Sequence, residues 1–261
     1  TSNTSMNLGA VTLNDATTLN SGGGSILLAS LNGGSKNLTL AGGIGAGTTT
    51  VTGNVTGLGS GTGAALTVKN GATGLVRFQG TVAGNSGIVA EAATSNLRFD
   101  QDVTLANGDT ATSIPGAVQL DGLNWSSYDG ITFGATTLST GAVTINSNNG
   151  NVIYDSTVNG SQNLTMVAGA GNIAFNGDVG QGTRLGKLQI DSAADVTIAN
   201  GKNISTGSIA IGDSVTNTGG ATGTVTFGGI TDTNGSEGIN INSKNIRIKD
   251  DMTTTNGGKI Q

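Results

Sequence analysis

Apolar and polar residues alternate with a period of two in short runs along the whole chain. Each run places two branched or long apolar side chains on one face of an extended strand and a polar residue, often Thr, on the other. Gly-, Asn- and Ser-rich segments, which are typical of turns, separate the runs. This pattern predicts an ordered, wholly β protein with strands of about three to five residues. Examples of the runs are Val11-Thr12-Leu13, Leu66-Thr67-Val68, Val103-Thr104-Leu105, Val143-Thr144-Ile145 and Val196-Thr197-Ile198.

Internal repetition is the strongest signal in the sequence. Residues 26–40 align without gaps on residues 152–166, 126 positions later, and DVTLANG at 102–108 recurs as DVTIANG at 195–201. All five Phe follow an aliphatic residue by two positions, and successive Phe are 21, 34, 42 and 52 residues apart. The spacing indicates a unit of about 20 residues, interrupted by insertions or by units without Phe. The five Phe are Phe78, Phe99, Phe133, Phe175 and Phe227.

A repeat of about 20 residues cannot bury a core by itself, so successive units must stack into a solenoid. We therefore expect an all-β fold, a right-handed parallel β-helix (β-solenoid) of about 20-residue coils, with Phe rings stacked along its axis. About 12 coils at the strand spacing of about 4.8 Å make a rod of about 60 Å. A flat β-solenoid or a sandwich is the alternative, but a sandwich does not require such self-similarity.

We expect residues 1–261 to form a single β-helical segment with one irregular insertion near residues 109–137. Residues 253–261 resemble residues 17–27, so the chain ends within a repeat. Because open solenoid ends expose both core and unpaired backbone, solenoids need caps, and neither end resembles one. We therefore expect a fragment of a longer repeat protein, whose partners are neighbouring repeats or identical subunits placed end to end.

Composition excludes several classes of protein. Gly accounts for 46 residues and charged residues for only 10% of the chain, which argues against helix bundles. The absence of Cys and His excludes a disulfide framework, a thiol nucleophile, an imidazole base and a conventional zinc site. The net charge of −5 has no basic run, so we expect no nucleic-acid binding. No apolar stretch approaches the length of about 20 residues that a membrane span needs.

Two kinds of candidate site occur in the sequence, and we expect neither to be functional. Residues 42–47 begin like a calcium-binding repeat, but Gly47 stands where a carboxylate ligand belongs, so we expect no metal and no cofactor. Acidic side chains on adjacent coils can form the carboxylate pair of a polysaccharide-cleaving enzyme. Most of these Asp stand where strands give way to turns, a usual place for Asp, so we expect a solvated surface and no enzyme. The pairs are Asp100 with Asp102 (near Arg98), Asp191 with Asp195, and Asp250 with Asp251.

The 109–137 segment contains the only Pro, Pro115, and the only Trp, Trp125. Aromatic side chains on a loop outside the helix stack on sugar rings or anchor a protein partner. If the chain contacts a ligand or partner specifically, we expect Trp125, Tyr128 and Asn124 to make the contact. The competing interpretation, which we favour, is that Trp125 fills a gap in an irregular coil.

Residues 163–190 (NLTMVAGAGNIAFNGDVGQGTRLGKLQI) and 245–260 (NIRIKDDMTTTNGGKI) resemble the β-strand repeats of giant bacterial surface exoproteins, the filamentous-haemagglutinin-like and autotransporter-like adhesins. The resemblance implies a secreted β-helical shaft outside a Gram-negative-type cell. It rests on repeat style and on no catalytic motif.

We therefore expect a structural shaft segment of a large secreted or cell-surface adhesin. Its role would be to support adhesion, biofilm or envelope assembly, with host or matrix glycans or proteins as further partners. A polysaccharide-degrading β-helical enzyme is the first alternative. An ice- or surface-binding β-solenoid is the second, although its outward Thr positions alternate irregularly with other residues.

Overall fold

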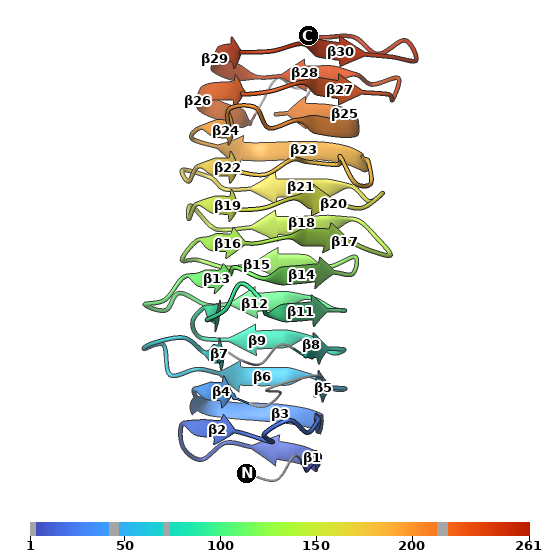
Figure 1. The fold of residues 1–261 in the computed structure, drawn as a ribbon. Helices are drawn as coiled ribbons and strands as arrows, with labels where there is room; N and C mark the ends of the chain where they lie inside the picture. The colour runs from blue at the N-terminus through green and yellow to red at the C-terminus, as the bar shows by residue number, and fades with distance from the viewer. Residues whose placement is uncertain (1–3, 42–46, 70–73, 213–218) are drawn as a thin grey trace.

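The computed structural model describes residues 4–41, 47–69, 74–212 and 219–261, which form one stack of parallel β-coils (Figure 1). Most strands pair in parallel with strands one coil before and one coil after them. Leu97, for example, pairs with Val76, 21 residues earlier, and with Val118, 21 residues later. The described residues make about 11 turns of roughly 21 residues each. The predicted β-solenoid with coils near 20 residues is confirmed.

The strands form three parallel ladders that run along the axis of the stack. Ladder 1 contains β1 (Met6–Thr12), β3 (Ile26–Lys36), β5 (Thr49–Val51), β8 (Leu75–Phe78), β11 (Asn96–Phe99), β14 (Ala117–Leu120), β17 (Thr136–Leu138), β20 (Val158–Asn159), β25 (Ile204–Ile211), β27 (Thr231–Thr233) and β30 (Met252–Thr254).

Ladder 2 contains β6 (Val55–Leu58), β9 (Val82–Gly84), β12 (Val103–Leu105), β15 (Asn124–Ser126), β18 (Val143–Asn146), β21 (Leu164–Val167), β23 (Leu185–Ala193) and β28 (Ile239–Ile241). The long strands β1, β3 and β25 bend through a corner, so their second halves also belong to ladder 2.

Ladder 3 contains β2 (Thr17–Leu19), β4 (Leu38–Leu40), β7 (Leu66–Val68), β10 (Ile88–Ala90), β13 (Thr112–Ile114), β16 (Ile131–Phe133), β19 (Val152–Tyr154), β22 (Ile173–Phe175), β24 (Val196–Ile198), β26 (Gly220–Phe227) and β29 (Ser243–Ile248).

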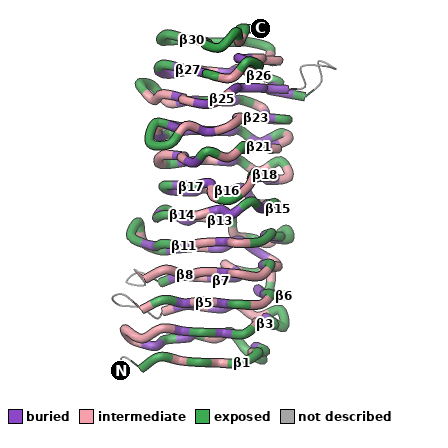
Figure 2. The backbone as a smooth tube through the Cα atoms, turned by 90° about the vertical axis from the view of Figure 1, so that its right-hand side faces the viewer, coloured by how far each residue is buried: buried purple, intermediate pink, exposed green. Residues whose placement is uncertain are grey.

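The core is a continuous column enclosed by the three ladders. In most short strands the outer two residues are buried and the middle one faces outward, as the period-two alternation requires (Figure 2). In β12, for example, Val103 and Leu105 are buried whereas Thr104 is exposed. Because the same pattern recurs in successive coils, apolar side chains stack on apolar side chains along the axis.

Asn and Asp side chains clamp the corners between coils. The Oδ1 atom of Asn151 accepts the N–H of Asn172 at 2.8 Å, and the Oδ1 atom of Asn172 accepts the N–H of Asp195 at 3.1 Å. The Oδ1 atom of Asp195 in turn accepts the N–H of Thr224 at 2.6 Å. These bonds satisfy backbone donors where the chain leaves one ladder for the next, which explains why corners are rich in Asn.

The buried aromatic rings form two columns joined by a bridge, not one stack. Phe78 and Phe99 lie in ladder 1, whereas the other three Phe and Tyr154 lie in ladder 3. The indole of Trp125, in ladder 2, lies 5.0 Å from the ring of Phe99 and 5.1 Å from that of Phe133. Phe rings do stack along the axis, as Phe78 and Phe99 do at 5.2 Å, but the five Phe are divided between two ladders, because the same local frame occurs in different ladders.

Residues 109–137 form no irregular insertion. They contain β13 to β16 and most of β17, each paired in parallel with the coils on either side. Val118 pairs with Thr136 only 18 residues later, so this part of the stack is shorter than the average coil. The expected insertion near 109–137 is therefore wrong. Trp125 and Phe133 of this segment are buried in the core, whereas Tyr128 is exposed.

Candidate functional site

Charged side chains on the outer face of ladder 1 form a ladder of alternating sign. Arg77 and Arg98 are paired residues of adjacent coils, and Asp100 lies between their guanidinium groups. The Nε atoms of Arg77 and Arg98 donate to Asp100 at 2.8 and 2.7 Å. Arg98 also donates to Asp121, which Gln119 holds through a bond of 3.0 Å. The group spans three coils and is neutral overall.

The pKa of Asp100 reflects this arrangement. Burial disfavours the carboxylate and acts to raise the pKa, but hydrogen bonds and the positive charges of Arg77 and Arg98 outweigh burial, so the pKa lies below its ordinary value. A carboxylate held ionised between two guanidinium groups makes a poor general acid. The ladder of charges is suited to joining coils.

The other predicted acidic pairs are also engaged in local structure. The Oδ1 atom of Asp102 accepts the N–H of Asn124 at 2.8 Å in the next coil. Asp191 accepts the side-chain amide of Gln189 at 2.9 Å. Asp250 accepts the N–H of the adjacent Asp251 at 2.8 Å, and Asp195 belongs to the corner clamps described above. The structure brings Arg98 to Asp100, as the sequence suggests, and engages Asp102 with the next coil.

The three residues predicted to contact a ligand are separated by the fold. Trp125 is fully buried (0% exposed), so it is not available on an outer loop, and the expectation that it reaches a partner there is wrong. Its side chain points inward because Trp125 pairs with Val103 and Ile145, which occupy inward positions of ladder 2. Tyr128 is 51% exposed and Asn124 is exposed, so only these two reach the surface.

A groove on the outer face of ladder 2 carries two opposite charges. We call it the ladder-2 groove, and it has two adjoining hollows of about 400 and 300 Å³ that share Lys187 and Glu237. The Nζ atom of Lys187 lies 3.1 Å from Oε2 of Glu237, and Ser208 donates to the same oxygen at 3.3 Å. The hydrogen bond from Lys187 and its positive charge lower the pKa of Glu237.

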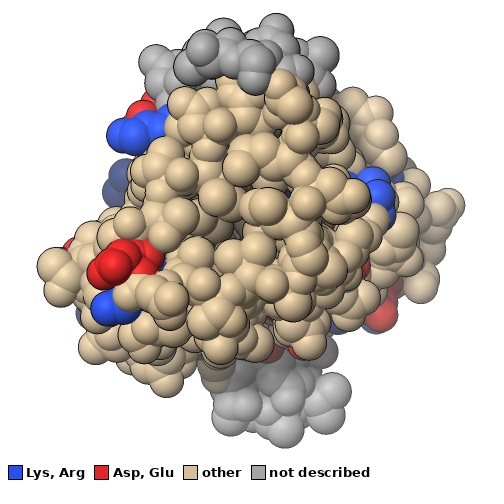
Figure 3. All heavy atoms as spheres, turned by 90° about the horizontal axis from the view of Figure 1, so that it is seen from below, with Lys and Arg blue, Asp and Glu red and all other residues tan. Residues whose placement is uncertain are grey.

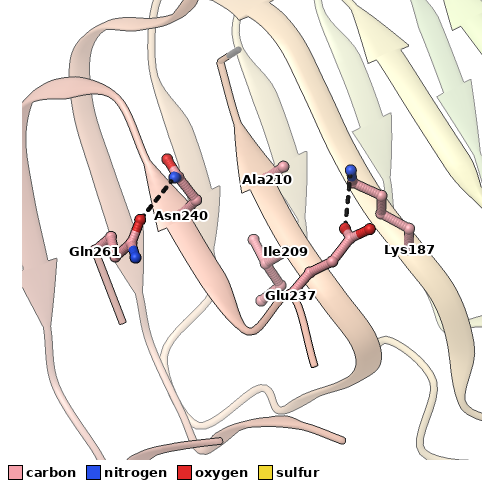
Figure 4. Close-up of a pocket in the computed structure, with 6 residues that line it drawn as sticks. All are labelled: Lys187, Ile209, Ala210, Glu237, Asn240 and Gln261. Carbon is pink, nitrogen blue, oxygen red and sulfur yellow. Dashed lines mark hydrogen bonds and ion pairs between the residues drawn. The ribbon is translucent and has the colours of Figure 1, made fainter. Parts of the chain in front are cut away.

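The larger hollow lies between a charged wall and an amide wall. Figure 4 shows Lys187 and Glu237 on one side of Ile209 and Ala210, and Asn240 and Gln261 on the other. The amide of Asn240 donates to the side-chain oxygen of Gln261 at 3.4 Å. Ala210 has a short side chain between these longer ones, which leaves a depression in the face of the ladder.

The smaller hollow owes its shape to glycine. It is lined by Gly186, Gly207 and Gly235, together with Ser208 and Asn163 among others. A Cβ atom at Gly207 would lie 2.3 Å from the carbonyl oxygen of Gly186, and one at Gly235 would lie 2.6 Å from that of Gly207. Backbones of successive coils therefore approach each other closely here, and only glycine is compatible with that approach.

Sequence reasoning missed the groove. Lys187 and Glu237 are 50 residues apart, and nothing in the sequence states that they lie two coils apart on one face. The rarity of Glu was the one signal in the sequence, which contains only Glu91 and Glu237. In the structure both form ion pairs with Lys.

The other ion pairs of the described residues, Lys69 with Glu91 and Arg184 with Asp232, are isolated pairs. Seen from the lower end of the stack, Lys, Arg, Asp and Glu appear at the periphery, and other residues occupy the centre (Figure 3). Within the described ranges no three acidic side chains are grouped so that they could hold a metal ion. The segment that begins like a calcium-binding repeat, residues 42–47, lies outside the described residues except for Gly47.

Comparisons with models of protein families, with curated proteins and with solved structures give no match for this chain. The parts of the chain that the structure describes contain no helix with the length and apolar character needed to cross a membrane.

Proposed function

We propose that this chain is a structural shaft segment of a large secreted or cell-surface bacterial adhesin or exoprotein. The observation that carries the proposal is the single apolar column that runs through the stack, enclosed by ladders paired in parallel from β1 to β30. A solenoid of this kind is quasi-one-dimensional, because each coil contacts mainly its neighbours. Such a fold serves extension, since added coils lengthen the rod without a new core.

Bonds between coils support a mechanical role. Backbone hydrogen bonds of the ladders run along the axis, and corner Asn and Asp side chains add further bonds in the same direction. Among the described residues, five of the six ion pairs join different coils. Stretching the rod has to break many of these bonds together, so the stack resists extension.

The proposed location and role follow from the repeat style of residues 163–190 and 245–260, which resembles bacterial surface adhesins. On this proposal the rod holds an adhesive element away from the cell and supports adhesion, biofilm or envelope assembly. Polysaccharide cleavage has less support, because Asp100 is held between two arginines. Ice binding also has less support, since the outward Thr column of ladder 3 is interrupted by Val89 and Ile153.

Small-angle scattering tests the rod. About 11 turns at about 4.8 Å per turn give a length of about 50 Å for the described coils. We expect a scattering profile of a rod whose longest dimension is at least this length and whose cross-section is constant. A compact, isotropic profile would contradict the shaft.

Labelling of producing cells tests the location. An antibody against the chain should bind intact bacteria, and external protease should remove the epitope. Labelling that requires lysis of the cells would refute surface display and leave the rod itself unaffected.

A further inference from the structure

We propose that the ladder-2 groove binds a neutral oligosaccharide. This inference goes beyond the shaft role and does not depend on it. The two hollows of about 400 and 300 Å³ each reach the lower end of the range of about 300–1,000 Å³ that small-ligand sites occupy. Because Lys187 and Glu237 line both hollows, a ligand that spans the charge pair fills two adjacent subsites. An oligosaccharide of two or more rings has this shape.

The charges of the groove favour a ligand without net charge. Lys187 and Glu237 lie 3.1 Å apart, so their fields largely cancel beyond the groove. An anionic ligand near Lys187 meets Glu237, and a cationic ligand near Glu237 meets Lys187. The opposite wall, Asn240 and Gln261, consists of neutral amides. Neither wall therefore offers a net charge to an ionic ligand.

The polar atoms of the groove match the chemistry of sugar hydroxyls, which both donate and accept. Lys187 and Ser208 both bond Oε2 of Glu237, so Oε1 accepts no hydrogen bond from the described residues. The Lys187 ammonium keeps further N–H donors. In the amide wall, Asn240 Oδ1 and Gln261 Nε2 are likewise not engaged with the described residues. Each wall therefore offers a hydrogen-bond donor beside an acceptor. Two neighbouring sugar hydroxyls can bond to such a pair, one accepting and the other donating.

The floor between the walls suits the apolar face of a sugar ring. Ala210 contributes a methyl group on the outer face of ladder 2, whereas the neighbouring Ile209 is only 1% exposed and occupies an inward position. The neighbouring hollow has a floor of glycine backbone, where the exclusion of any Cβ keeps the depression open. The C–H groups of a pyranose ring pack on such a surface while its hydroxyls reach the two walls.

The test is binding of the full chain to a panel of immobilised neutral oligosaccharides built from glucose, galactose and mannose, followed by titration with the strongest ligand. Glu237→Gln removes the acceptor charge at an exposed position, and Ala210→Leu fills the floor. Glu91→Gln is the matched control, because Glu91 pairs with Lys69 at 2.5 Å outside the groove. Unfolding midpoints verify that each variant remains folded.

We expect at least one neutral oligosaccharide to bind, with an affinity that changes little with salt. Glu237→Gln and Ala210→Leu should each weaken binding about tenfold or more, whereas Glu91→Gln should leave it unchanged. No neutral ligand bound at millimolar concentration would overturn the proposal. Equal loss in the control, unchanged binding in both groove variants, or binding restricted to anionic polysaccharides with steep salt dependence would overturn it too. Failure here leaves the rod-like scattering profile unaffected, so the two proposals fail separately.

Discussion

At Trp125 the core carries an indole between two phenylalanine rings, each about 5 Å away and nearly perpendicular to it. Edge-to-face packing of this kind adds about 0.5–1.5 kcal/mol per pair to the burial of the rings. Because the indole bridges the two aromatic columns, its loss affects both. Single residues of the core therefore stabilise more than their own coil.

Trp125→Ala should lower the free energy of unfolding by about 3–5 kcal/mol, since it leaves a cavity between the columns. Tyr128→Ala, at a half-exposed position three residues later, should change it by less than about 0.5 kcal/mol. Chemical denaturation followed by circular dichroism measures both. Similar losses in the two variants would show that Trp125 does not bridge the core.

Tyr154, in the ladder-3 aromatic column, carries a polar group into the core. Its hydroxyl is buried without a hydrogen-bond partner among the described residues, and burial raises the pKa of the phenol. Tyr154→Phe removes this unsatisfied group and keeps the ring stacked on Phe175 at 5.2 Å. We expect the free energy of unfolding to stay equal or to rise by about 1 kcal/mol. A loss of more than about 1 kcal/mol in denaturant titration would mean that the hydroxyl is satisfied.

At the scale of the strand and its corner, side chains repeatedly form hydrogen bonds or ion pairs with the next coil. Corner Asn and Asp residues accept backbone N–H groups that no ladder satisfies, and the arginine–aspartate ladder joins the outward positions of β8, β11 and β14. Both devices act along the axis. They specify the register between strands of successive coils, which stacked Val, Leu and Ile side chains do not specify by themselves.

Asn151 tests the corner clamps, because its Oδ1 atom accepts the N–H of Asn172 at an exposed corner. Asn151→Ala removes the acceptor and should lower the free energy of unfolding by about 0.5–1.5 kcal/mol. Asn151→Asp keeps an acceptor oxygen in the same place and should be close to neutral. Denaturant titration compares the two, and equal effects would show that the clamp contributes nothing.

Asp100 should make stability depend on pH in the acid range. Its pKa in the folded protein is lower than in the unfolded chain, so its contribution is complete above the unfolded value of about 4. That contribution is lost as the pH falls through the lower folded pKa. Asp100→Asn should lower the free energy of unfolding at pH 7 by about 1–3 kcal/mol and flatten its decline below about pH 4. Denaturant titrations at several pH values measure this. An unchanged acid limb in the variant would refute the assignment.

At the scale of the whole molecule, the stack is a sum of coils and interfaces between coils. The number of residues between paired positions varies from 18, between Val118 and Thr136, to 30, between Ile209 and Ile239. All four of these residues are buried, so coils of different length keep the same inward positions. The number of residues in a coil can therefore vary, whereas the alternation of buried and outward-facing residues within each strand is maintained.

Removal of one complete coil should be tolerated. Because Val118 and Thr136 occupy equivalent positions, deletion of residues 118–135 takes out 18 residues and keeps every later strand in its ladder. We expect this variant to retain a β-type circular dichroism spectrum and cooperative unfolding, in a rod about 4.8 Å shorter. Deletion of residues 118–126 removes only half a coil, so every later strand is shifted out of its ladder. That variant should not fold, and equal behaviour of the two would contradict the coil assignment.

The amino-acid sequence by itself determined the strands, their inward and outward positions and the parallel stacking. The period-two pattern specifies which side of each strand is buried, as at Val103, Thr104 and Leu105, and repetition requires that like units stack. These features depend on strand geometry over a few residues, so they are encoded locally.

Only the tertiary structure decided which ladder each strand joins. The repeated segments 102–108 and 195–201 place Val103 in ladder 2 and Val196 in ladder 3. The repeating element is thus one strand with its corner, and corners of variable length set the position around the coil. Burial of Trp125 and the meeting of Lys187 with Glu237 depend on that position, because register is fixed only when coils close and stack.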